Sequence, residues 1–232
     1  MTSEVFIRFR RELESAAEPD YAVFSRSLTP TQYPILGVRI PYLRKKTLHL
    51  FRQGIRSIPL RSDSSHEEIL AAGILLARSD FPLSELFPLI EDYLSLVDNW
   101  AACDTFCSEL KRAREMPEPF RELIRPLFRD SREFYVRFAE VLLLNAFVRD
   151  EYIAENLELL ASVTHPGYYA CMGAAWALSV CYVDYPDETE KLLLSSRLRP
   201  EIRKRTVRKI KESNRVTLEQ KERIQLLTAD LE

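Results

Sequence analysis

The feature that most constrains the fold of this sequence is a pair of helices that recurs about every 33 residues. Apolar residues follow helical spacing in 66–79 and again in 132–148. A helix pair with this period is typical of an α-solenoid, in which each pair buries its apolar face against its neighbours. We expect the first helices to begin near His66, Asp98, Arg132, His165 and Arg199, and the shorter second helices to cover about 83–95, 117–128, 150–160, 187–195 and 217–228.

The N-terminal third is less regular than the rest of the chain. It predicts helices near 3–16, 20–28 and 40–52, with a loop at 29–39. No stretch shows the alternation of a β-strand, and no linker is rich enough in polar or flexible residues to divide the chain. We therefore expect an all-α fold in a single domain over residues 1–232, with N-terminal helices in 1–60 and repeating helix pairs in about 66–228.

Composition narrows the function classes. The 33 Lys and Arg residues and 35 Asp and Glu residues give a net charge of -2, so the chain is not a broadly basic nucleic-acid binder, although local charge can still bind phosphate. Four cysteines without a CxxC pair and three scattered histidines favour buried thiols over a zinc site. The N-terminal segment lacks an apolar signal core, and no apolar run approaches the roughly 20 residues that span a membrane. A cytoplasmic protein that is not bound to membranes is expected.

A tryptophan and an aspartate share one face of a predicted first helix. Trp100 and Asp104 lie four residues apart, and Asp98 or Asn99 can cap the helix that carries them. An aromatic ring beside a carboxylate can form a reactive site. The alternative is a buried tryptophan beside a surface aspartate.

The next first helix carries an arginine in an apolar stripe. Arg137 lies among Phe134, Val141 and Leu144 at helical spacing. A guanidinium that stays charged there needs a carboxylate, a carbonyl or a phosphate as its partner. The alternative to a functional arginine is a structural ion pair, for example with Asp104.

The last two first helices carry an aromatic segment and a basic run. Tyr168, Tyr169 and Trp176 can build a platform for a planar group, or they can be core residues. Residues 197–215 contain nine basic and two acidic residues and can contact phosphates without sequence preference. A solvated basic helix face is the alternative.

Taken together, these stretches resemble the DNA alkylation repair family of AlkD-like glycosylases. The resemblance extends from about Tyr21 to Leu227, and the combination of its pieces is specific. The matching stretches are YPILGVRIPYLRK at 33–45, DNWAACDTFCSELK at 98–111, EFYVRFAEVLLL at 133–144, YYACMGAAWALSVCYV at 168–183 and KIKESNRV at 209–216.

The resemblance implies a superhelix of HEAT-like antiparallel helix pairs that binds duplex DNA on its concave face. It implies excision of positively charged alkylated purines, such as 3-methyladenine and 7-methylguanine, without a base-binding pocket, a metal or a cofactor. Trp100 and Trp176 would flank the lesion nucleotide, Asp104 would be the catalytic carboxylate, and Arg137 would lie beside it. A monomer is the family's usual state. The residues expected to bind DNA are Arg39, Arg44, Lys45, Lys111, Tyr168, Tyr169, Arg205, Arg208 and Lys209.

Two functions remain open at this point. The first is a monofunctional DNA N-glycosylase, because no lysine stands out as a Schiff-base nucleophile. The second is a noncatalytic HEAT-like scaffold that binds DNA structures or a protein partner. The net negative charge favours the scaffold, as does Ala170, which stands where many relatives carry a basic residue.

Overall fold

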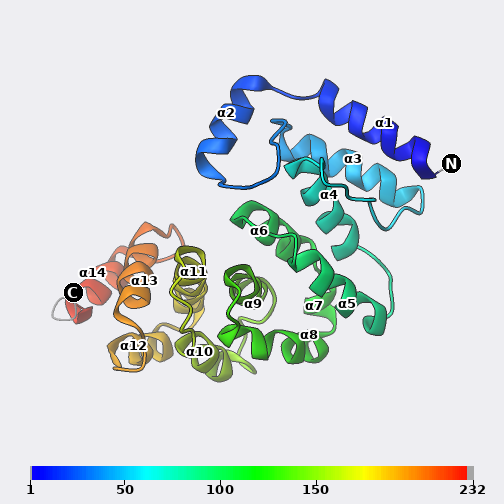
Figure 1. Ribbon diagram of the computed structural model, residues 1–232. Helices are drawn as coiled ribbons and strands as arrows, with labels where there is room; N and C mark the ends of the chain where they lie inside the picture. The colour runs from blue at the N-terminus through cyan, green and yellow to red at the C-terminus, as the bar shows by residue number, and fades with distance from the viewer. Residues whose placement is uncertain (1, 229–232) are drawn as a thin grey trace. The chain divides into compact units, whose positions relative to one another are not determined.

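The computed structural model describes residues 2–228, and this part of the chain is helical without β-strands. The helices form two compact units, Met1–Lys111 (unit 1) and Arg112–Glu232 (unit 2). Within each unit successive first helices pack side by side, which confirms the α-solenoid class (Figure 1). The prediction that residues 1–232 form a single domain stays a prediction.

Unit 1 is built around α4. Its neighbours are α3 on one side and α6 on the other. Ser65 and Glu68 form a capping box at the start of α4, in which each side chain accepts the other residue's backbone N–H. The helices of unit 1 are α1 Thr2–Ser15, α2 Pro19–Leu28, α3 Ile40–Arg52, α4 His66–Ala77, α5 Leu83–Leu94 and α6 Trp100–Glu109.

In unit 2, α11 packs against both α9 and α13, and the second helices α10, α12 and α14 form a row of neighbours (Figure 1). The small residues Ala170, Gly173 and Ala174 are fully or largely buried on α11, so its neighbours can approach closely. The helices are α7 Arg112–Glu115, α8 Pro117–Ile124, the 3-10 helix η1 Arg125–Arg129, α9 Glu133–Ala146, α10 Ile153–Ala161, α11 Tyr168–Asp184, α12 Pro186–Leu194, α13 Pro200–Glu212 and α14 Leu218–Thr228.

The predicted helices all occur in the structure, with ends that differ by a few residues. The sequence did not predict α7, which is a single turn with only one buried residue, Ala113. The four cysteines are buried free thiols, as expected. None of the helices in residues 2–228 combines the length and the apolar character needed to cross a membrane.

The loop at 29–39 is held to the helices of unit 1 by two carboxylates. Glu67 is only 2% exposed, and it accepts backbone N–H bonds from Leu36 at 3.0 Å, Gly37 at 2.8 Å and Val38 at 3.1 Å. Asp98 accepts bonds from the Thr31 hydroxyl at 2.8 Å and from the backbone N–H of the next residue at 2.7 Å. These bonds hold the loop against α4 and against the segment that precedes α6.

Gly37 lets this loop pass close to α2. Its φ of 86° lies in the left-handed region, which residues with a side chain rarely adopt. A Cβ at this position would lie 2.7 Å from the backbone nitrogen of Ala22. The Gly37 carbonyl also accepts the Glu18 N–H at 3.1 Å, at the N-terminal end of α2. Gly37 thus sets the position of α2 against the loop.

We expect Glu67→Gln to lower the free energy of unfolding by about 2–3 kcal/mol, because an amide nitrogen cannot accept the N–H bonds that a carboxylate oxygen accepts. At least one buried loop amide would lose its partner. Denaturant unfolding of the variant measures the loss. Glu14→Gln, at an exposed glutamate of α1, is the matched control. Equal stability of the two variants would contradict this role of Glu67.

Candidate functional site

The first predicted site residues lie at the start of α6. Asn99 caps this helix, because its side-chain oxygen accepts the Ala102 N–H at 3.0 Å. Of the two predicted caps, Asn99 is therefore the one used, whereas Asp98 binds the loop. Trp100 is the first residue of α6, and Asp104 follows one turn later on the same face. Both side chains are half-buried.

A hydrogen bond holds the indole ring of Trp100 in place. Its Nε1–H donates a 2.9 Å hydrogen bond to the carbonyl of Leu28, the last residue of α2. A carbonyl in the last turn of a helix has no partner within that helix, so the indole satisfies an otherwise open acceptor. The bond orients the ring and ties α6 to α2.

Trp100 and Asp104 both line a cavity of about 180 Å³ in unit 1. Pockets that enclose small molecules are typically about 300–1,000 Å³, so this one is too small to enclose a nucleotide. The cavity can instead present an aromatic face and a carboxylate to a chemical group that lies at its mouth and is not enclosed by it. The remaining wall includes Tyr21, Phe24, Leu28, Ile35, His66 and Leu70.

His66 supplies an imidazole ring to this cavity. Burial lowers the pKa of the His66 imidazole, although the nearby Glu67 and Asp98 act in the opposite direction. Its Nδ1 lies 3.4 Å from the side-chain nitrogen of Asn99. Burial therefore favours the uncharged form of this imidazole.

The predicted arginine of unit 2 is buried on α9. Arg137 is 6% exposed, and its Nη1 donates to the backbone carbonyl of Tyr169 at 2.9 Å. Its guanidinium carbon lies 5.9 Å from the centre of the Tyr169 ring. The Tyr169 ring also packs against Phe134, with the ring centres 5.3 Å apart. Trp176 lies two turns further along α11 and is half-buried.

The predicted DNA-binding residues of α11 and α13 meet at one surface of unit 2. Tyr168 is 56% exposed, and the Arg205 guanidinium lies 4.9 Å from its ring centre. Arg205 pairs with Glu201 at 2.8 Å, and Arg208 pairs with Glu212 at 2.8 Å. Lys209 lies 3.8 Å from a Glu212 oxygen. Exposed ion pairs within one helix contribute little, so these cations can exchange a carboxylate for a phosphate.

The predicted DNA-binding residues of unit 1 are all on its surface. Arg39 pairs with Glu18 at 2.8 Å and stacks 4.1 Å from the Tyr21 ring centre. Arg44 pairs with Glu109 at 3.0 Å. Two lysines of this group are exposed side chains, Lys45 on α3 and Lys111 just after α6.

Ala170 has a structural explanation. Its side chain is fully buried, and its N–H and that of Tyr169 point to Oε1 of Glu133, at 3.3 and 2.6 Å. The carboxylate of α9 therefore occupies the N-terminal end of α11, where a helix otherwise attracts anions. This end of α11 is accordingly less available to a phosphate than an open helix start.

The structure brings Trp100 and Asp104 together in unit 1, and Arg137 and Tyr169 together in unit 2. Sequence reasoning missed Glu67 and considered Asp98 only as a helix cap, although both residues hold the loop beside the cavity. Their positions gave a weak signal, because an acid at a helix start is usually explained by the helix dipole. In residues 2–228 no group of three or more His, Cys, Asp or Glu residues is arranged to hold a metal ion.

The fold and these residues define an α-solenoid with an aromatic and acidic cavity in one unit and a basic, aromatic surface in the other. Residues 9–210 match the model of the family described as DNA alkylation repair enzyme, so the chain belongs to that family. Membership gives the protein a role in DNA alkylation repair, with DNA as its partner. No curated protein matches the chain.

Proposed function

We propose that the protein is a monofunctional DNA N-glycosylase that excises positively charged alkylated purines, such as 3-methyladenine and 7-methylguanine, from duplex DNA in base excision repair. The observation that carries the proposal is the pairing of Trp100 and Asp104 around a cavity too small for a nucleotide. A site of this kind can act on the deoxyribose while the base stays outside it.

The chemistry follows from the charge of the damaged base. Alkylation makes the purine cationic, so cleavage of its bond to C1′ releases a neutral base and leaves oxocarbenium character on the sugar. The Asp104 carboxylate stabilises that positive charge and orients the water that adds to C1′. The water's proton passes to the carboxylate or to solvent, and an abasic sugar remains.

The aromatic residues and the arginine hold the nucleotide in this proposal. The indole faces of Trp100 and Trp176 pack on the sugar and favour the positive charge that develops there. Arg137 contributes a buried cation beside an aromatic ring, which suits a phosphate oxygen. No step requires a general acid, because the leaving base already carries its positive charge.

A second function is favoured by one specific observation. Glu133 occupies the start of α11, so its carboxylate adds a negative charge, outside the basic run, at the helix that carries Tyr168. A noncatalytic scaffold that recognises DNA structures, or a protein partner, would function with this weaker positive potential at the surface of α11 and α13.

Base release separates the two functions. We expect the protein to release 7-methylguanine and 3-methyladenine from methylated duplex DNA, as measured by chromatography of the free bases. The strands should stay intact until alkali is added, because the proposed enzyme has no lyase step. A duplex with an uncharged lesion, such as hypoxanthine, is the control. Binding to methylated duplex without base release, at enzyme in excess over DNA, would favour the scaffold.

A further inference from the structure

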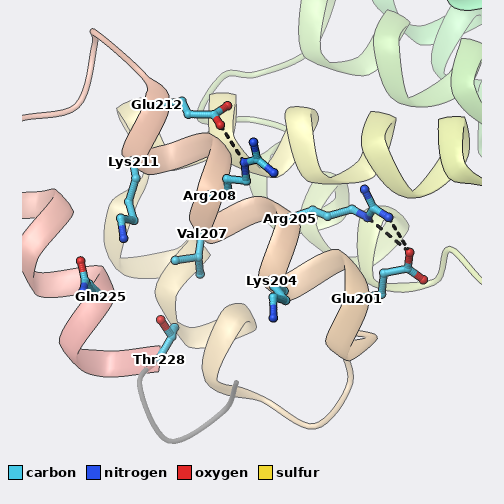
Figure 2. A pocket seen from close by; sticks show the side chains of 9 residues that line it. All are labelled: Glu201, Lys204, Arg205, Val207, Arg208, Lys211, Glu212, Gln225 and Thr228. Atoms are coloured by element: carbon cyan, nitrogen blue, oxygen red, sulfur yellow. Dashed lines mark hydrogen bonds and ion pairs between the residues drawn. The ribbon is translucent and has the colours of Figure 1, made fainter.

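Helix α13 carries cations on two different faces. Arg205 lies beside Tyr168 and Met172 of α11, and Arg208 lines the same hollow as these two residues. Figure 2 shows that Lys204 and Lys211 lie on the other side of the helix, with Val207 between them. Positions 204, 207 and 211 share one helix face because they are separated by three and four residues.

This second face borders a groove of about 710 Å³ between α13 and α14. Gln225 and Thr228 line the α14 side of the groove (Figure 2). Val207 is 5% exposed and forms part of the floor, whereas the side chains of Lys204 and Lys211 are exposed. The lining also includes Arg205 and Arg208 with their partners Glu201 and Glu212, so the groove has an apolar floor, a primary amide from α14, and four cations and two carboxylates from α13.

The two lysines keep their charge available to a ligand. Among residues 2–228, neither has a carboxylate oxygen within the 4.0 Å of an ion pair, whereas Arg205 and Arg208 are each paired at 2.8 Å. The two glutamates of the lining are used by those arginines. The groove therefore presents a net positive charge in a chain whose net charge is -2.

The spacing of the lysines suits a nucleic-acid backbone. Seven residues of α-helix rise about 10.5 Å. One strand of B-DNA carries a phosphate about every 3.4 Å of its axis, so the helix segment from Lys204 to Lys211 runs along about three phosphates.

We propose that the α13–α14 groove is a second site for the DNA backbone, in which Lys204 and Lys211 contact phosphates of one strand. The family match ends at residue 210, so Lys211 and all of α14 lie outside it. The site adds affinity for DNA without taking part in base release. It depends on DNA being the partner and not on the proposed glycosylase chemistry.

The test is the salt dependence of binding to undamaged duplex DNA. We expect Lys204→Gln/Lys211→Gln to bind roughly tenfold more weakly at low salt, and its slope of log affinity against log salt to be smaller by about 1.8, because each lost phosphate contact removes about 0.9. Glutamine has a helix propensity close to that of lysine, so α13 should be kept. Arg129→Gln/Lys191→Gln removes the same charge from exposed side chains elsewhere in unit 2 and should leave the slope unchanged.

Several results would overturn the proposal. They are an unchanged slope in the groove variant, an equal fall in slope in both double variants, or no measurable binding of the wild-type protein to duplex DNA at low salt. Loss of polyglutamate binding with an unchanged DNA slope would assign the groove to an acidic protein segment instead. Base release from methylated DNA is measured separately on wild-type protein. Its failure would refute the glycosylase while the groove result stands.

Discussion

Replacement of Asp104 by asparagine should nearly abolish base release while leaving DNA binding largely intact. The change keeps the size and shape of the side chain on α6 but removes its negative charge. Removal of one preorganised electrostatic group from an active site typically costs about 10²–10³ in rate. We expect a fall of that order in the single-turnover rate of 7-methylguanine release.

The controls for this result lie in the same unit. Asp92→Asn removes one charge from an exposed position of α5 and should release base at the wild-type rate. Affinity for undamaged duplex and denaturant unfolding should both stay close to wild type for the Asp104 variant. Base release at the wild-type rate from Asp104→Asn would remove this residue from the mechanism.

Replacement of either tryptophan should have a graded effect. Trp100→Phe and Trp176→Phe keep an aromatic face and should keep part of the activity, whereas the alanine variants should lose most of it. A stacking or cation–π contact is worth on the order of 1–3 kcal/mol, which corresponds to about one to two factors of ten in rate. The measured quantity is the single-turnover rate per folded molecule.

Stability separates a site tryptophan from a core tryptophan. A core role predicts that the alanine variants lose about 3–5 kcal/mol of unfolding free energy with little change in activity per folded molecule. A role in the site predicts a small loss of unfolding free energy and a large loss of activity per folded molecule. Trp100→Phe should also lose about 1 kcal/mol, because it removes the N–H bond to the Leu28 carbonyl. Trp176→Phe serves as the internal comparison.

The sequence was sufficient to predict the helical architecture, because the apolar stripe of each first helix is long and repeats at a constant interval. The single-turn α7 was missed for a physical reason. Residues 112–115 contain one alanine among charged residues, and one turn is too short to show a period. Its place is set by neighbouring helices and not by its own sequence.

The candidate site was less predictable, because the charge of a residue in the sequence does not show whether it is paired inside the protein or exposed to a ligand. Arg203 was counted in the basic run, yet it is buried and donates to the carbonyls of Leu193 at 2.6 Å and Leu198 at 3.2 Å. Lys204, its neighbour in sequence, is exposed in the groove. Only the helix rotation, which depends on tertiary packing, decides which of two adjacent cations can meet a phosphate.

The bonding of the 29–39 loop has a consequence for the dynamics of the cavity wall. The Leu36, Gly37 and Val38 amides end on a buried carboxylate, so solvent deuterium reaches them only when the loop separates from α4. In amide exchange this irregular segment therefore behaves as part of the same cooperative unit as the helix that holds it. The loop is therefore already ordered before a substrate contacts the cavity wall. Its conformational entropy is lost during folding, so binding does not carry that cost again.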